Sequence, residues 1–246
     1  MRYLWLIALP LLVTSDLDAR VLFSSAGGPP KSIAFVAFGS GTESTGSALT
    51  TYTMAYTSSA ATTNEMLIFM FHTASGTGTT PAAAATYNSL TCSTIAETPG
   101  KTNGFLDMFA CPIGTGDGVS HNFVATMVSG ANITNAIAYV GEYSGVLQSS
   151  YNDASNSGSS PSPISTSVTP IAIGDWIVAV EQNGISTPTV ACSPFTHTER
   201  FNADVGSFGA GTFEDSGGTV TTVLQTCTWT VSGANVGDVM MAMKHG

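Results

Sequence analysis

A five-residue segment that occurs twice constrains the fold of this chain more than any other feature. Residues 128–132 and 231–235 both read VSGAN, at an offset of 103 residues (231 minus 128). Each copy follows a run with the period of a β-strand and leads into an apolar run. The sequence therefore predicts that a β unit has been duplicated within the chain.

Two further pairs of matching segments support the duplication. Trp176–Val180 (WIVAV) matches Met66–Met70 (MLIFM) at an offset of 110, and residues 190–193 (VACS) match residues 90–93 (LTCS) at an offset of 100. Because the three offsets are similar, we expect insertions and deletions only in the loops. We also expect the two copies to share a single apolar interior.

The apolar runs have the lengths and periods of strands. Met66–Phe71 is continuously apolar, which indicates a central strand covered on both faces. Leu49–Tyr56 alternates between polar and apolar residues, as in a half-buried strand. In residues 219–231 the same alternation predicts a set of inward-facing side chains: Val223, Cys227, Trp229 and Val231.

These patterns predict an all-β fold, an antiparallel jelly-roll-like β-sandwich built from two duplicated halves. Strands, not helices, are expected at residues 133–143 and 236–244. A stretch rich in Ser, Asn, Gly and Pro indicates an exposed connector between the halves. The expected parts are a signal peptide at 1–19, a linker at 20–31, a β-sandwich domain at 32–246 with half-repeats 32–147 and 164–244, and the connector at 148–163.

The composition limits the classes of partner. Only 9% of the residues are charged, compared with about 25% in a typical soluble domain. Thr, Ser, Asn and Gly must therefore cover the surface, as in extracellular sandwiches, capsid-like shells and fibres. The net charge is −10, and the six Lys and Arg residues are scattered along the chain. Since nucleic-acid binding depends on clustered basic residues, nucleic acid is not an expected partner.

The N-terminal residues 1–19 have the features of an export signal. Arg2 gives a positive start, Leu4–Val13 is an apolar segment, and a cleavage site is expected after Ala19. The apolar segment is too short to span a bilayer as a helix, so no stable membrane span is expected. The protein is therefore expected to be secreted, extracellular or on a particle surface. The alternative is an apolar N-terminal arm that packs against a neighbouring subunit.

The four cysteines suit an exported protein with two disulfides, for which three pairings exist. The duplication favours one bridge in each half, Cys92–Cys111 and Cys192–Cys227. Four buried free thiols are the alternative. The chain contains no Cys-x-x-Cys spacing, so a zinc site is not expected.

The succession of apolar runs and glycines is similar to that of a known family. The segments SIAFVAF, MLIFMF, IAYVGEYSGV, GDWIVAV and TWTVSGANVGDVMMAM resemble the two-half jelly-roll sandwiches of structural and tail proteins of tailed bacteriophages. Similar modules occur in bacterial surface proteins, and the fold is related to concanavalin- and laminin-G-like domains. The resemblance covers residues 32–244 and implies a structural role without catalytic residues.

The sequence patterns that could support catalysis are incomplete. Ser144 lies in a G-x-x-S-G segment, which lacks the spacing of a nucleophile elbow. The adjacent Glu214 and Asp215 should point to opposite faces of a strand and so cannot flank one glycosidic bond. Glycoside cleavage would instead need three separate acids to converge: Glu181, Glu199 and Asp204. The histidines are expected in surface or strand-end positions: His72, His121, His197 and His245. No catalytic residue is predicted.

Binding patterns are equally sparse. Calcium is possible where Asp117, or Asp153 with Asn152 and Asn156, supplies loop oxygens. A glycan would need exposed loop aromatics, for which Tyr87, Tyr151 and Phe208 are candidates, whereas Trp176 and Trp229 are expected in the core. Residues 132–134 form a glycosylation sequon. No metal site is predicted, and the ligand-binding residues remain unassigned.

The sequence favours a non-catalytic extracellular structural or attachment protein, such as a surface, fibre or virion-type subunit. Its expected partners are copies of itself or neighbouring structural subunits. A carbohydrate-binding, lectin-like module is the alternative, and a glycoside hydrolase or lyase on a jelly-roll fold comes third.

Overall fold

The computed structural model describes seven stretches of the chain: residues 32–44, 49–74, 82–98, 105–128, 134–183, 186–232 and 235–246. The expected signal peptide (1–19), the linker (20–31) and the centres of both VSGAN segments lie outside the described residues, as do the first two residues of the sequon.

The described chain is built from strands, with one short 3₁₀ helix, η1 (Gly206–Phe208). The first half contains β1 (Ala34–Ser44), β2 (Thr51–Thr57), β3 (Thr63–Ala74), β4 (Ala82–Tyr87), β5 (Leu90–Glu97), β6 (Leu106–Thr115), β7 (Ser120–Met127) and β8 (Asn135–Ser144). The second half contains β9 (Asn152–Pro161), β10 (Ile164–Val168), β11 (Trp176–Asn183), β12 (Thr189–Ser193), β13 (Thr198–Asp204), β14 (Ala210–Asp215), β15 (Gln225–Thr230) and β16 (Asn235–Met243).

The first half is a jelly roll. Its strands are hydrogen-bonded in the order β1-β8-β3-β6-β5-β4-β7-β2, and all the pairs are antiparallel. β5 changes layer within its length, because residues 90–92 pair with β4 and residues 93–97 pair with β6. A five-stranded layer, β1-β8-β3-β6-β5, therefore lies opposite a three-stranded layer, β4-β7-β2. Two layers of this kind, made from eight strands, are the architecture of a complete jelly roll.

The second half repeats this topology strand for strand. Its five-stranded sheet has the order β9-β16-β11-β14-β13, and its three-stranded sheet has the order β10-β15-β12. Each order follows from that of the first half when eight is added to the strand numbers. The all-β antiparallel sandwich with two duplicated halves is thus confirmed. Each half is a complete jelly roll, however, and not one half of a shared one.

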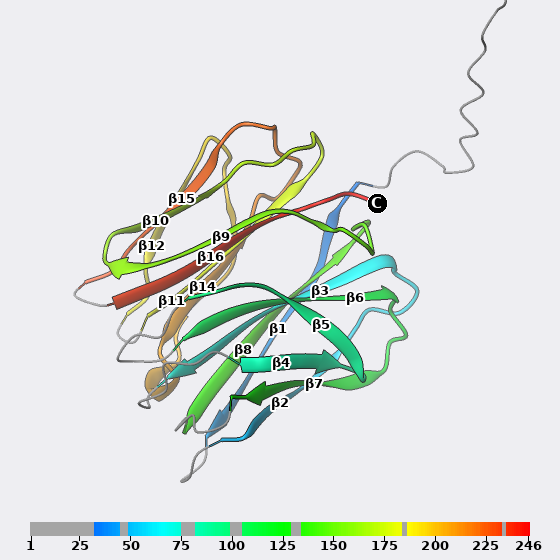
Figure 1. Cartoon of the computed structure of the whole chain (residues 1–246), viewed down its shortest axis with the longest axis horizontal. Coiled ribbons are helices and arrows are strands. Elements are labelled where there is room, and N and C mark those ends of the chain that lie inside the picture. Colours follow the sequence, from blue (N-terminus) through cyan, green and yellow to red (C-terminus); the bar gives the residue numbers. More distant parts are fainter. Residues whose placement is uncertain are drawn as a thin grey trace, which may run out of the picture.

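The four layers enclose three apolar cores, so the expectation of a single shared interior was wrong. The two five-stranded sheets pack face to face in the middle of the molecule, and the three-stranded sheets lie outside them (Figure 1). β3 lies between two of these cores, so all of Met66–Phe71 is buried, as expected for a central strand. Its even-numbered side chains (Met66, Ile68, Met70) enter the central core, and its odd-numbered ones (Leu67, Phe69, Phe71) enter the core of the first half.

The connector expected at residues 148–163 contains a strand. β9 pairs with β16 along its whole length, so the second half begins at this strand. The hydroxyls of Ser155 and Ser157 donate hydrogen bonds to the carbonyls of Ile95 and Glu97 on β5, at 3.3 and 2.8 Å. A composition typical of a loop therefore belongs to an edge strand whose hydroxyls join the two halves.

The two halves run in the same direction. β3 starts beside the end of β8 (Met66 opposite Tyr143), and β11 starts beside the end of β16 (Trp176 opposite Met243). These two strand ends are in contact, since the Gly246 amide donates a hydrogen bond to the Gly145 carbonyl at 2.8 Å. The loops that precede β3 and β11 therefore lie at one end of the molecule.

Both expected disulfides are confirmed, Cys92–Cys111 between β5 and β6 and Cys192–Cys227 between β12 and β15. The matching LTCS and VACS segments are nevertheless not equivalent. One lies on β5 and the other on β12, which is the counterpart of β4. The two bridges thus join different pairs of strands in the two halves.

The predicted alternation in residues 219–231 holds only within the strand. Cys227, Trp229 and Val231 are buried in the core of the second half. Val223 is 50% exposed, contrary to the prediction, because β15 begins only at Gln225.

Removal of one disulfide tests how far the bridges stabilise the fold. The variant Cys192→Ala/Cys227→Ala is expected to lower the free energy of unfolding by about 3–4 kcal/mol, because the bridge closes a loop with a sequence separation of 35 residues in the unfolded chain. Urea unfolding followed by tryptophan fluorescence measures the change. Cys92→Ala/Cys111→Ala is the matched variant, with a separation of 19 residues and a slightly smaller expected loss. Losses below about 1 kcal/mol in both variants would contradict this account.

Candidate functional site

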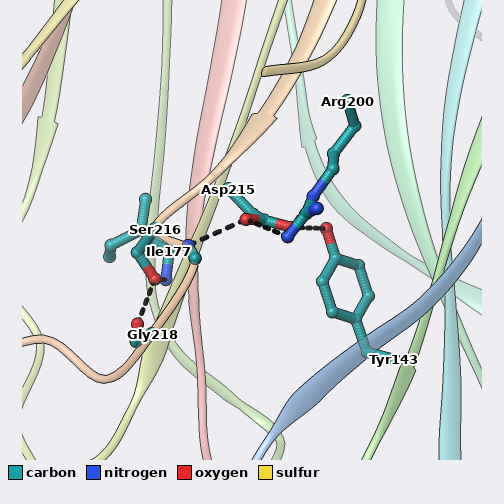
Figure 2. A network of polar contacts seen from close by, with 7 residues as sticks. Tyr143, Ile177, Arg200, Asp215, Ser216 and Gly218 are labelled. Carbon is teal, nitrogen blue, oxygen red and sulfur yellow. Dashed lines mark hydrogen bonds and ion pairs between the residues drawn. The ribbon is translucent and has the colours of Figure 1, made fainter. Parts of the chain in front are cut away.

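A polar network between the two halves is the first of four polar clusters in the fold. Arg200 on β13 donates two hydrogen bonds to the carboxylate of Asp215 on β14, at 2.7 and 3.0 Å (Figure 2). Tyr143 on β8 of the first half donates a third, at 3.2 Å. The Arg200 guanidinium also lies 3.8 Å from the centre of the Phe35 ring. Every group has a partner, so this network joins the halves and leaves little capacity for chemistry.

Asp215 and Glu214 point to opposite faces of β14, as predicted. Asp215 faces the central core, whereas Glu214 lies on the side of Trp229 and Thr212, which are themselves hydrogen-bonded at 3.1 Å. Burial raises the pKa of Glu214 well above its ordinary value. The two carboxyls cannot act on one bond.

The second cluster is a pair of buried carboxyls in the first half. Glu142 on β8 accepts hydrogen bonds from the Tyr56 hydroxyl at 2.7 Å and from the Ser59 amide at 2.9 Å. Glu65 on β3 lies next to it, fully buried, and neither of its oxygens accepts a well-formed hydrogen bond from the described residues. Burial, together with the Glu142 carboxyl, raises the pKa of Glu65 to about 8.

The third cluster occupies the corresponding place in the second half. Asp175 directly precedes Trp176, as Glu65 directly precedes Met66, and it is also fully buried beside a second carboxyl, Asp153. Here an ammonium group and an imidazole are close. The Lys244 ammonium lies 3.1 Å from Asp153, and Nδ1 of His245 lies 3.7 Å from Asp175. Burial and Asp153 raise the pKa of Asp175 to about 7.

Three more buried acids accept one hydrogen bond each from neutral donors. Asp107 accepts from the Ala82 amide at 2.9 Å, Glu181 from Asn183 at 3.0 Å, and Asp238 from Thr166 at 2.8 Å. Burial raises the pKa of Asp107 and of Glu181 to about 8, and that of Asp238 to about 6. Arg200 and Lys244, the Lys and Arg residues of the described chain, are engaged by other acids.

The fourth cluster lines a small pocket, about 50 Å³ in volume, at the loop end of the first half. His121 lies 2.7 Å from Asp117, and the amide of Asn88 lies 3.4 Å from the same imidazole nitrogen. The hydrogen bond from His121 lowers the pKa of Asp117. The pocket is lined by Ser58, Tyr87, Asn88, Leu90, Ile113, Thr115, Asp117 and His121. It combines hydrogen-bonding groups with an apolar wall, which suits a small polar ligand.

Apolar side chains are exposed at the same end of the second half. Ile171 and Ile173, in the loop before β11, are 76% and 74% exposed, and Val223 and Leu224, in the loop before β15, are 50% and 58% exposed. The two loops are joined by backbone hydrogen bonds between residues 174–175 and Val220, at 3.4 and 2.8 Å. A second pocket, about 210 Å³ in volume, lies between the β12–β13 and β14–β15 loops.

The acids expected to converge for glycoside cleavage have separate partners. Glu181 is buried beside Asn183, Glu199 accepts a hydrogen bond from Asn202, and Asp204 accepts one from the Gly206 amide. Ser144 is partly buried at the end of β8, opposite Ala34. The candidate catalytic residues are thus dispersed.

The histidines occupy different environments. His72 is fully buried, and burial lowers its pKa to about 3, so it is neutral. His121 lines the small pocket and His245 faces Asp175, while His197 is half-buried between β12 and β13.

The expected binding residues do not form a common platform. Tyr87 and Tyr151 are buried and Phe208 packs against the central core, so the prediction of exposed loop aromatics was wrong. Trp176 and Trp229 are in the core, as predicted. Asn152 donates a hydrogen bond to Ser155, and Asn156 donates one to the Ser167 carbonyl. Within the described ranges, no group of three or more His, Cys, Asp and Glu side chains is arranged to hold a metal.

The pairs of buried carboxyls were not found by sequence reasoning. A usable signal exists, because an acid stands directly before each of the central runs MLIFM and WIVAV. An acid at the start of a strand buried on both faces must itself be buried.

Comparison with protein-family models, with curated proteins and with solved structures gives no match to this chain. Among the described residues, no helix has the length and apolar character needed to cross a membrane. The two disulfides are compatible with an oxidising, extracellular compartment.

The buried acids predict that stability falls as the pH rises. A carboxyl whose pKa is higher in the folded than in the unfolded state binds its proton more tightly when folded. Glu181 therefore lowers the unfolding free energy progressively between its ordinary pKa of 4.5 and its folded pKa of about 8. The slope for one such group is at most about 1.4 kcal/mol per pH unit.

The variant Glu181→Gln removes one of these protons. Its stability is expected to decline less between pH 5 and pH 8 than that of the wild type, by on the order of 1.4 kcal/mol per pH unit within that range. Urea unfolding at several pH values measures the slope. Glu199→Gln makes the same chemical change on an exposed side chain and should keep the wild-type slope. If Glu181→Gln keeps that slope as well, the buried acid does not control stability.

Proposed function

We propose that this protein is a non-catalytic extracellular structural or attachment subunit that associates with copies of itself. The candidate catalytic residues are dispersed, and the charged groups at the junction of the halves are paired with one another. Two jelly rolls that pack on one another through an apolar core, each with one internal disulfide, form a stiff body. Stiffness of this kind suits a building block.

The observation that carries the proposal is the group of exposed apolar side chains on the loops before β11 and β15: Ile171, Ile173, Val223 and Leu224. Adjacent exposed apolar residues mark interaction surfaces more often than chance. Backbone hydrogen bonds between the two loops fix this surface before any partner arrives. Two copies with a net charge of −10 each repel one another, so an uncharged surface is the favourable place for them to meet.

The double variant Ile171→Ser/Ile173→Ser tests the assembly. We expect the wild type to form oligomers as its concentration rises, and the variant to need at least a tenfold higher concentration, about 1.4 kcal/mol, for the same degree of association. Light scattering after gel filtration, and electron microscopy of the assemblies, measure this change. Val119→Ser is the matched control, since Val119 is 53% exposed on a loop at the same end of the first half. A wild type that stays monomeric at high concentration would contradict the proposal.

A glycan-binding role is the second candidate, and the pocket lined by Asn88, Asp117 and His121 favours it. Amide, carboxylate and imidazole groups converge there beside the exposed side chain of Leu90. Sugars are recognised by such groups, with polar atoms for the hydroxyls and an apolar surface for the ring carbons.

The pair of variants Asn88→Gly and His121→Ala tests this role, because Asn88 has a φ of 48°, which glycine adopts without strain. Each should weaken glycan binding at least tenfold, or about 1.4 kcal/mol, while the unfolding temperature stays close to that of the wild type. A glycan array identifies a ligand, and calorimetry then gives the affinities. Asn122→Ala, an exposed amide on β7 outside the pocket lining, is the control. An array without hits for the wild type, with calcium present, would remove the candidate.

A further inference from the structure

We propose that the first half carries a cation site of the calcium class between the carboxyls of Glu65 and Glu142. The inference is independent of the proposed assembly and of glycan binding. It depends on three features of the described residues: an unpartnered buried carboxylate, converging oxygen atoms, and a comparison with the second half.

The first feature is Glu65 itself. Its side chain is fully buried next to Glu142, and although the Thr62 hydroxyl and the Gly116 amide are close to it, neither of its oxygens accepts a hydrogen bond of good geometry from the described residues. An ionised carboxylate without a partner is strongly disfavoured in a protein interior, and two adjacent ones are more so. The pair therefore requires either a shared proton or a positive ion.

The second feature is the set of oxygens around the pair. The carbonyl oxygen of Ser59 and Oε2 of Glu65 both pack closely against Gly116, since a Cβ added there would overlap both oxygens. The Tyr56 hydroxyl lies 2.7 Å from Glu142 on the other side. Carboxylate, carbonyl and hydroxyl oxygens, held here by β2, the β2–β3 loop, β3 and β8, are the ligands that calcium prefers, and calcium tolerates irregular geometry.

The third feature is the related pair in the second half. Asp175 has the same position before its central apolar run as Glu65, and its partner Asp153 lies 3.1 Å from the ammonium of Lys244. In the second half, Lys244 follows Met243 of β16. The corresponding residue of the first half, which follows Tyr143 of β8, is the neutral Ser144. The second half thus places a cationic side chain beside its carboxyl pair, and the first half has no such side chain at the equivalent position.

The surroundings of the pair supply no competing cation. The titratable groups that face it are the phenols of Tyr56 and Tyr87, and Asp117 and His121 lie further out in the pocket. Arg200 is held by Asp215, and Lys244 is held by Asp153. A bound divalent ion would balance both carboxylates and fasten the loops that carry Ser59 and Gly116 to β3 and β8.

Calcium-dependent unfolding of the full chain tests the site. At pH 7.5, calcium chloride at about 100 times its dissociation constant is expected to raise the unfolding temperature of the wild type by several degrees over the protein in EDTA. Glu65→Gln should abolish this shift, because it removes one ligand charge and keeps the side-chain volume. Asp175→Asn is the matched control in the second half and should keep the shift.

A second measurement does not depend on the folding of a variant. Terbium, which replaces calcium in oxygen sites, should luminesce on excitation of tyrosine in the wild type, because Tyr56 contacts Glu142 directly. Calcium should displace it with a single-site curve, and magnesium should compete poorly. If the wild type shows neither the calcium shift nor sensitised terbium, the pair holds a shared proton and the proposal is wrong. It is also wrong if Glu65→Gln keeps both signals.

Discussion

The face-to-face packing of the two five-stranded sheets is the interaction on which the rest of the structure depends. It buries β3 and β11 on both faces, so their central runs, Met66–Phe71 and Trp176–Val180, are apolar at every position and not at alternate positions. The central layer is rich in methionine, with Met66, Met70, Met108, Met241 and Met243. Flexible thioether side chains can fill the irregular space between two twisted sheets. Aromatic contacts close one edge of this layer, where Phe38 of β1 stacks on Phe201 of β13 with ring centres 5.6 Å apart.

This packing also explains where the buried charges lie. An acid placed at the end of a doubly covered strand has no route to solvent, and few basic residues are available to pair with it. The two halves meet this constraint differently. The Asp153–Asp175 pair has Lys244 beside it. In the Glu65–Glu142 pair, only Glu142 accepts well-formed hydrogen bonds, and both come from neutral donors. The two halves thus keep the same position for the acid but differ in its counter-charge. The pair in the second half is a structural ion pair, and the pair in the first half is a potential binding site.

The sequence predicted the features that depend on the local periodicity of apolar residues. It missed the features that depend on how the sheets are layered. The runs MLIFM and WIVAV identified the central strands, and the expectation of one bridge in each half gave both disulfides, although the cysteines of the two halves are not at equivalent positions. The number of cores could not be predicted from the sequence. A strand that is covered by a sheet of its own half has the same apolar pattern as a strand that is covered by a sheet of the other half. β9 was missed because its Ser and Asn residues are typical of loops, and only its pairing with β16 and its hydroxyl contacts to β5 make it a strand. Buried acids such as Glu181 were missed because a single polar residue in a strand is ordinarily assigned to its open face.

The common direction of the two halves gives the surface features a single orientation. Because the loops before β3 and β11 lie at one end, the polar pocket of the first half and the apolar loops of the second half also lie at that end. The Glu65–Glu142 pair is directly beneath the same loops, since Ser59 and Gly116 belong to them. A cation bound there would therefore stiffen the surface on which both proposed contacts depend, although it touches neither. Calcium would then affect attachment through this end of the molecule by ordering the loops. An effect of calcium on binding would therefore not by itself show that the ion lies in the interface.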